Sequence, residues 1–223
     1  MEFEYGTVDT AYSVHLATVP PEDDGPIWMV NFMRYRERAD YGEAGGPDIS
    51  GREADDRYSP VEILDDLGAE VAYFGDVVGP DGATDPDWDR MAIVRYPTRR
   101  SFIDMLSRPD FEAKRVHKDA GMAFTIIMCC LPTAPVTEGG YASGPVWFTA
   151  YPAGAAPGDA LGEGATFEVE GIAIGDDRRW SVLEVTWSAP EPGRRLPDGA
   201  LVVRSVPLID RIAPLVDDAL AGA

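Results

Sequence analysis

The chain has 223 residues, of which 45% are hydrophobic, and a formal net charge of −20. Domains usually contain about 100 to 150 residues, so the chain can form one large or two modest hydrophobic cores. The negative charge repels phosphate backbones and anionic lipid surfaces, so we expect neither nucleic acid nor a membrane as a partner. The start, MEFEYGTVDT, has no signal-peptide pattern, and no apolar run approaches the ~20 residues that span a bilayer, so we expect a cytoplasmic protein.

Strand and helix patterns alternate over residues 25–132. PIWMVNFM at 26–33 predicts a strand, and SPVEILDDLG at 59–68 predicts a helix that Gly68 ends. AEVAYFGDVVG at 69–79 and WDRMAIVRYP at 88–97 are rich in β-branched and aromatic residues and predict two more strands. Thr98 can cap a helix, Pro109 suits the first turn of its continuation, and Gly121 ends it. A fourth strand, MAFTIIMCCLP at 122–132, completes the split βαβ pattern of a ferredoxin-like domain.

The second part of the chain resembles the first. GPIWMVNFM at 25–33 returns as GPVWFTAYP at 144–152, and GAEVAYFGDVVG at 68–79 matches GATFEVEGIAIG at 164–175 in length and in all three glycines. RWSVLEVTWS at 179–188 and ALVVRSVP at 200–207 then predict the third and fourth strands. The helices between them are replaced by segments rich in Pro, Gly and Arg, and a helix is expected near the end, over 207–222. These matches indicate a degenerate internal repeat.

We therefore divide the chain into an N-terminal extension at 1–24, a ferredoxin-like repeat at 25–135, and a degenerate second repeat with a C-terminal helix at 140–223. A four-stranded sheet with helices on one face leaves its other face exposed to solvent. An exposed apolar face is expected to pack against another part of the protein or another chain. The second repeat can supply that partner. The predicted fold class is α+β, a ferredoxin-like dimeric α+β barrel formed by two repeats in one chain, with a cavity for a small molecule between the two repeats.

Particular motifs carry a resemblance to a known family. MVNFMRYRE at 29–37 and WDRMAIVRYPTRRSFIDMLSRPDFEAKRVHKDAG at 88–121 are similar to an uncharacterised dimeric α+β barrel family related to EthD-like and antibiotic-biosynthesis monooxygenase domains. The resemblance covers about residues 25–132. It implies a ferredoxin-like fold, a sheet-to-sheet dimer with a ligand cavity, and small-molecule chemistry without a tightly bound cofactor. Residues 140–223 depart from the single-domain pattern, which favours a fused monomeric pseudo-dimer over the usual homodimer.

Three residues are candidates for catalysis. Asn31 is the one polar residue in an apolar strand, so its amide needs a partner, which a ligand or the neighbouring backbone can supply. His117 carries the side chain best suited to proton transfer near neutral pH, or it interacts with the end of its helix. Asp76 lies within an apolar strand face, where burial would raise its pKa and make it a general base, whereas exposure at a strand edge would leave it solvated.

Other polar and aromatic groups are candidates for binding a substrate in the cavity; they are Arg34, Tyr58, Tyr73, Trp88 and Arg95. Tyr73 and Trp88 serve equally well as packing residues. His15, in the extension, is expected to be a surface or strand histidine. With two histidines, no His-Glu-x-x-His and no spaced cysteine pair, we expect no metal site, and with no Gly-x-Gly-x-x-Gly or Walker-type motif we expect no cofactor.

Two functions remain open at this stage. The first is a cofactor-independent enzyme of cyclase, isomerase or oxygenase type, such as occur in secondary metabolism, that acts on an apolar or polyketide-like substrate in the barrel cavity. The second is a non-catalytic small-molecule-binding or stress-associated protein with the same cavity.

Overall fold

The computed structural model describes residues 4–78, 88–136, 140–155, 164–189 and 194–221. The strands are β1 (Thr7–Val8), β2 (Ile27–Tyr35), β3 (Glu70–Val77), β4 (Arg90–Tyr96), β5 (Met122–Ala134), β6 (Val146–Pro152), β7 (Ala165–Gly175), β8 (Trp180–Thr186) and β9 (Leu201–Asp210). The helices are α1 (Thr10–Thr18), the 3₁₀ turn η1 (Gly42–Ala44), α2 (Gly51–Tyr58), α3 (Val61–Asp66), α4 (Arg99–Leu106), α5 (Pro109–Gly121) and α6 (Ile212–Ala221).

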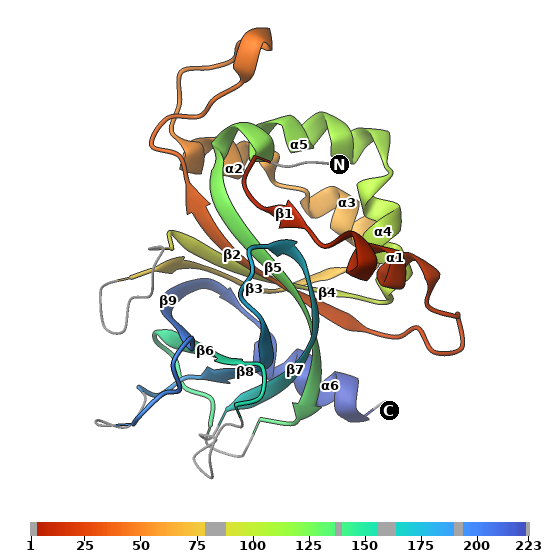
Figure 1. Cartoon of the computed structure of the whole chain (residues 1–223), viewed down its shortest axis with the longest axis vertical. Coiled ribbons are helices and arrows are strands. Elements are labelled where there is room, and N and C mark those ends of the chain that lie inside the picture. Colours follow the sequence, from red (N-terminus) through yellow and green to blue (C-terminus); the bar gives the residue numbers. More distant parts are fainter. Residues whose placement is uncertain (1–3, 79–87, 137–139, 156–163, 190–193, 222–223) are drawn as a thin grey trace.

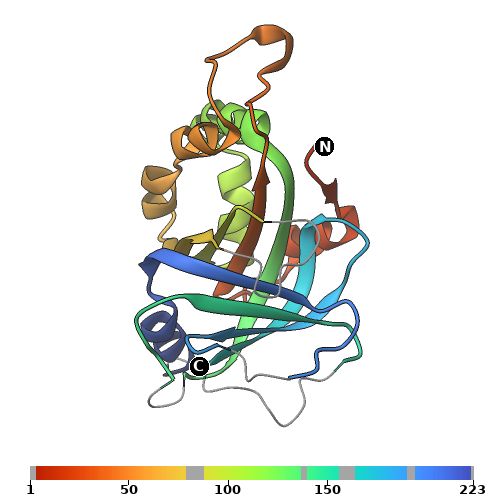
Figure 2. The ribbon, with the colours of Figure 1, turned by 90° about the vertical axis from the view of Figure 1, so that its left-hand side faces the viewer.

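Eight antiparallel strands close into one barrel. Their order is β7-β5-β2-β4-β3-β9-β6-β8, and pairing of β8 with β7 closes the ring (Figures 1 and 2). β7 is long enough to pair with β8 near Ala165, with β5 along its length and with β1 at Gly175. A closed barrel has no free edge strand, so all eight strands have partners on both sides.

The strands fall into two sets of four with the same order. Numbered along the chain within each set, β5-β2-β4-β3 and β9-β6-β8-β7 both read 4-1-3-2. The fourth strand of each set pairs with the second strand of the other, as β5 with β7 and β9 with β3. The segments at 25–135 and 140–223 thus contribute to a single continuous sheet.

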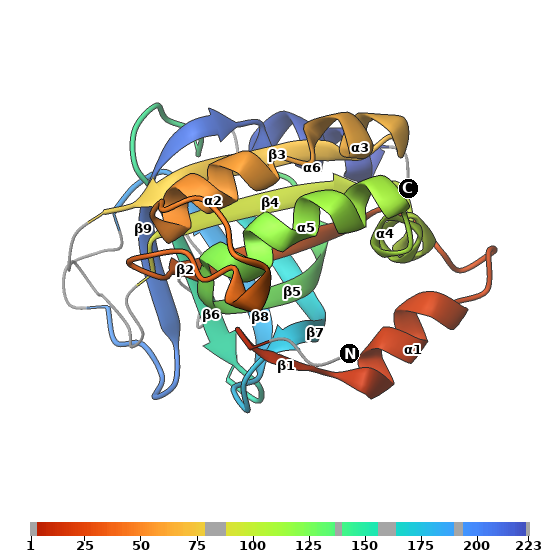
Figure 3. The ribbon, with the colours of Figure 1, turned by 90° about the horizontal axis from the view of Figure 1, so that it is seen from above.

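Alternation along β2 separates two layers of the core. Trp28, Val30 and Phe32 face the barrel interior and join a continuous cluster of buried apolar side chains. Ile27 and Met29 face outward and pack beneath the helices with residues such as Phe102 and Phe111. Figure 3 shows α2, α3, α4 and α5 lying over the strands of the first set.

Local sequence signals explain most of the helix boundaries. Thr98 caps α4 with a reciprocal bond to Ser101, and Pro109 begins α5, as the sequence predicted. α2 was not predicted. It begins with a capping box between Ser50 and Glu53, and it lies so close to the end of α5 that a Cβ on Gly51 would be 2.4 Å from the Gly121 carbonyl oxygen.

Two further helices cover parts of the barrel that the helices of the first set leave open. α6 contributes Ile212, Ala213, Leu215 and Val216 to the interior cluster and contacts β3, β5 and β7, so it closes one end of the barrel. α1, in the predicted N-terminal extension, covers β7 from outside and buries Leu16. The residues described include no helix with the length and apolarity needed to span a membrane.

Candidate functional site

The three predicted catalytic residues make their polar contacts with different groups. Asn31 lies on the outward face of β2, half-buried, and its Nδ2 donates to the Met29 carbonyl oxygen at 3.1 Å. This is the backbone bond that we considered as the alternative to a ligand. His117, on α5, has its Nδ1 2.9 Å from the Tyr41 hydroxyl, which belongs to the loop before α2.

Asp76 does not meet the condition for a general base. Its side chain is 33% exposed and pairs with Arg52 and with Arg90, whose Nε lies 3.1 Å from Oδ1. Burial raises the pKa of Asp76, but hydrogen bonds from these two arginines outweigh that effect and lower the pKa below its usual value. The full burial that would have raised the pKa of Asp76 is absent, because the carboxylate is partly exposed and is held by two cations.

The five predicted binding residues are dispersed. Arg34 is exposed, and Tyr58 packs edge-on against Phe111 in the outer layer, where burial raises its pKa well above the usual value. Arg95 pairs with Asp218 of α6 at 3.0 Å. Tyr73 and Trp88 are buried in the barrel interior.

The barrel interior contains three polar atoms without a hydrogen-bond partner among the described residues: Nε1 of Trp28, the hydroxyl of Tyr73 and Nε1 of Trp88. They lie at different levels. Trp28 is at the Arg95 end of β4, Tyr73 is opposite Ile93, and Trp88 packs on Phe32 near the other end of β2. Because they do not converge, they do not define one binding site.

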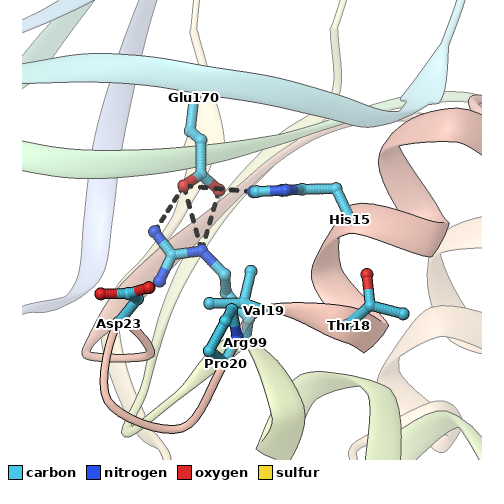
Figure 4. A pocket seen from close by; sticks show the side chains of 7 residues that line it. All are labelled: His15, Thr18, Val19, Pro20, Asp23, Arg99 and Glu170. Carbon is cyan, nitrogen blue, oxygen red and sulfur yellow. Dashed lines mark hydrogen bonds and ion pairs between the residues drawn. The ribbon is translucent and has the colours of Figure 1, made fainter.

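A pocket lies outside the barrel, between α1, the segment that follows it, the start of α4 and β7. Its volume is about 270 Å³, just below the usual range of small-molecule pockets. Figure 4 shows its seven lining residues, which are His15, Thr18, Val19, Pro20, Asp23, Arg99 and Glu170. Val19 and Pro20 supply an apolar wall, and the side chains of Arg99 and His15 both point toward the Glu170 carboxylate (Figure 4).

Arg99 and Glu170 form the fixed side of this pocket. Nε of Arg99 lies 3.0 and 3.1 Å from the two carboxylate oxygens, and Nη2 also contacts Oε1. Nη1 reaches Asp24 at 3.4 Å, and Asp24 also accepts from the first backbone N–H groups of α4. Burial raises the pKa of Glu170, but hydrogen bonds from Arg99 and Tyr12 lower it below its usual value, so the carboxylate is ionised.

Tyr12 joins α1 to this ion pair. Its hydroxyl donates to Oε2 of Glu170 at 2.6 Å, and its ring stacks on His15 with 5.7 Å between ring centroids. Burial is the main reason that the pKa of Tyr12 lies far above its usual value, so the phenol stays protonated. The sulfur of Cys129 lies 3.6 Å from Oε2 of Glu170. Burial raises the pKa of the Cys129 thiol to about 12, so the thiol stays protonated and unreactive.

His15 is the histidine of the pocket, and its imidazole is exposed. Its Nε2 lies 3.7 Å from Oε1 of Glu170, and its side chain is 49% exposed while that of Glu170 is 19% exposed. An exposed imidazole can exchange its proton with a ligand. The arrangement can therefore donate a proton to, or accept one from, a molecule in the pocket.

Tyr12, Arg99 and Glu170 were not among the predicted site residues. His15 was expected to be a surface or strand histidine; it is exposed, but it lies on the helix α1 and not on a strand. One signal was present: Glu170 is a carboxylate between Val169 and Gly171 in a predicted strand, and a buried charge needs a partner. Its partners come from α1 and α4, at least 71 residues away. Within the described residues no group of three or more His, Cys, Asp or Glu side chains is arranged to hold a metal ion.

Comparisons with known proteins identify relatives of the fold. No family model and no curated protein matches the chain. The crystal structure of the methylated RPA0582 protein is 26% identical, with a TM-score of 0.50, and the match covers 59% of this chain and 98% of that one. A second structure, of the RPA0582 protein of unknown function from Rhodopseudomonas palustris, is 24% identical, with a TM-score of 0.49, and the match covers 60% of this chain and all of that one.

A mutant chlorite dismutase from Candidatus Nitrospira defluvii matches 94% of this chain and 98% of its own length. The identity is 12% and the TM-score is 0.43. The α+β fold with a closed antiparallel barrel follows from the strand pairing of this chain itself.

Proposed function

We propose that this protein is a cofactor-independent enzyme that moves a proton on a small molecule bound in the pocket between α1, α4 and β7. One observation carries the proposal: an accessible imidazole, His15, stands at the wall of a pocket beside a carboxylate, Glu170, that Arg99 and Tyr12 hold in place. An acid–base group oriented by a fixed third group is a recurring catalytic arrangement.

His15 would act as the acid or base, and Glu170 would stabilise the imidazolium that forms. Among the reactions expected from the sequence, isomerisation and cyclisation need only such proton transfer. The apolar part of the substrate would lie against Val19 and Pro20. We assign the substrate to this pocket and not to the barrel interior, because the interior carries a continuous cluster of buried apolar side chains.

A second candidate function is the binding of a small molecule without turnover, and the distance between His15 and Glu170 favours it. The 3.7 Å between Nε2 of His15 and Oε1 of Glu170 is longer than a hydrogen bond, so the two groups are not yet aligned as a catalytic pair. Catalytic hydrogen bonds often tighten only when substrate binds, which keeps the enzyme as the first proposal.

We also propose that the chain is a fused tandem of two ferredoxin-like repeats, related to the EthD-like and antibiotic-biosynthesis monooxygenase domains, and that it acts as a monomer in the cytoplasm. The 4-1-3-2 order of both strand sets and the repeated Gly-Pro-x-Trp phrase favour duplication. The free, buried cysteines Cys129 and Cys130 are compatible with a reducing compartment. Light scattering would test the monomer: a mass near 24.2 kDa supports it, and twice that mass contradicts it.

The enzyme proposal is tested by turnover. The protein is incubated with a defined mixture of small metabolites that carry carbonyl, hydroxyl or amino groups, and mass spectrometry records which compounds are converted. We expect wild type and His117→Gln to convert the same compound, and His15→Gln to convert it at least 100-fold more slowly. Conversion by His15→Gln at the wild-type rate would contradict the proposal, and so would a lack of any conversion by wild type.

A further inference from the structure

We infer that the pocket between α1, α4 and β7 selects a small organic amine in its cationic form. The inference rests on the proposed function for its site but concerns the charge of the ligand, which the proton-transfer argument leaves open.

The charges around the pocket are unequal. Among the residues that line it, Asp23 and Glu170 carry carboxylates, Arg99 carries a guanidinium and His15 carries an imidazole. With His15 neutral, these groups sum to −1. Just outside the lining, the carboxylate of Asp24 and the guanidinium of Arg100, which donates to the Ala17 carbonyl oxygen of α1, carry opposite charges. The chain as a whole adds to this bias, since its formal net charge is −20. A cation is therefore attracted to this pocket and an anion is repelled.

The one guanidinium is already engaged. Arg99 uses Nε and Nη2 on Glu170 and Nη1 on Asp24, and its side chain is only 8% exposed. A carboxylate or phosphate ligand would have to displace one of these two protein carboxylates. Such a ligand would gain one ion pair by breaking another, so Arg99 gives the pocket little affinity for anions.

Asp23 is the carboxylate that remains available. It lines the pocket, it is exposed, and no described cation lies within ion-pair distance of it. An ammonium group at Asp23 would pair with this carboxylate, while a short carbon chain would cover Val19 and Pro20, which form the adjacent wall (Figure 4). The volume of about 270 Å³ restricts the ligand to a small molecule.

The probes are isobutylamine, isobutanol and isobutyric acid, which share one carbon skeleton and differ in charge. Binding is followed by NMR from the ring signals of His15 in the full-length protein labelled at histidine. The protein has two histidines, so His117→Gln assigns the signals. We expect isobutylamine to shift the His15 signals in a saturable way and to bind at least about fivefold more tightly than isobutyric acid.

Two variants separate a local effect from net charge. Asp23→Asn should weaken isobutylamine binding by about threefold, whereas Asp217→Asn, which removes the same charge from an exposed position on α6, should leave it unchanged. Tighter binding of isobutyric acid, equal binding of all three probes, no binding of isobutylamine, or equal effects of the two variants would overturn the inference.

The outcomes also distinguish the inference from the proposed function. If wild type converts an anionic metabolite and His15→Gln does not, the proposed function stands and the preference for amines fails. If isobutylamine binds as expected and no metabolite is converted, the preference stands and the enzyme proposal fails.

Discussion

Arg99 on α4 and Glu170 on β7 form a bidentate ion pair beside the pocket, which joins the segment at 25–135 to the segment at 140–223. Nε of Arg99 lies 3.0 and 3.1 Å from the carboxylate oxygens, and neither side chain is more than 19% exposed. Removing one partner of such a pair leaves a charge that is partly buried and uncompensated.

Arg99→Met should therefore lower the free energy of unfolding by about 2 kcal/mol. Its neighbour Arg100 is well exposed, with an i,i+4 ion pair to Asp104 and a hydrogen bond from Nη1 to the Ala17 carbonyl oxygen at 3.3 Å, so Arg100→Met should cost about 0.5 kcal/mol or less. Chemical denaturation of the two variants measures both values. Equal losses would mean that the Arg99–Glu170 pair adds nothing beyond a surface ion pair.

Acidification should weaken the ion pair between Glu170 and Arg99, because it protonates the Glu170 carboxylate. The pKa of Glu170 in the folded state lies below the usual 4.5. The stability that the ionised Glu170 contributes is therefore complete at pH values above 4.5, and it is lost as the pH falls through the folded-state pKa. The difference in unfolding free energy between wild type and Glu170→Gln should be constant from about pH 8 to about pH 5 and shrink by about pH 3. A difference that grows on acidification would contradict the ionised carboxylate.

A buried ion pair on the outer face of the second strand set gives a third prediction. Glu184 is 1% exposed on β8, accepts from Tyr151 at 2.8 Å and pairs with Arg194 at 3.0 Å. Arg194→Met should lower the free energy of unfolding by about 3 kcal/mol, because it leaves the Glu184 carboxylate buried without this cation. The adjacent and exposed Arg195 is the matched control, and Arg195→Met should have almost no effect in the same denaturation experiment.

The close packing of α1 on β7 gives a fourth prediction. A Cβ on Gly171 would lie 2.3 to 2.6 Å from ring atoms of Tyr12, so Gly171→Ala must displace Tyr12 and with it the helix. We expect a loss of about 2 kcal/mol in unfolding free energy and faster proteolysis near α1. Gly25→Ala is the control, since nothing lies within 4 Å of its added Cβ. Similar proteolysis of both variants would show that α1 is not held through this contact.

Strands β2 to β9 and helices α3 to α6 could be predicted because their signals are local, whereas β1 and α1 in the N-terminal extension were not predicted. Alternating apolar residues mark β2, β3, β4 and β5, and Thr98 and Pro109 mark the starts of α4 and α5. α2 escaped prediction because the residues that it buries are Gly51, Ala54 and Asp55. Asp55 is tolerated there because the Tyr35 hydroxyl of β2 donates to it at 2.5 Å and Arg90 of β4 pairs with it at 3.4 Å. Such compensation between distant elements has no local pattern.

The site escaped prediction for the same reason. A histidine on a short helix and a glutamate in a strand are ordinary features until folding brings them to 3.7 Å. The predicted candidates Asn31 and His117 were chosen from their residue types, and each has a protein partner in the structure, the Met29 carbonyl oxygen and the Tyr41 hydroxyl. Composition and spacing identify groups that can react but not the groups they face.

The position of a bound ligand decides between the outer pocket and the barrel interior. A crystal structure of the wild-type protein, grown with the compound that it converts or with isobutylamine, would reveal which part of the molecule the ligand occupies. We expect density between His15, Asp23 and the Val19–Pro20 wall, with the Arg99–Glu170 pair intact. Density inside the barrel beside Trp28, Tyr73 or Trp88, with the outer pocket empty, would contradict the proposed site.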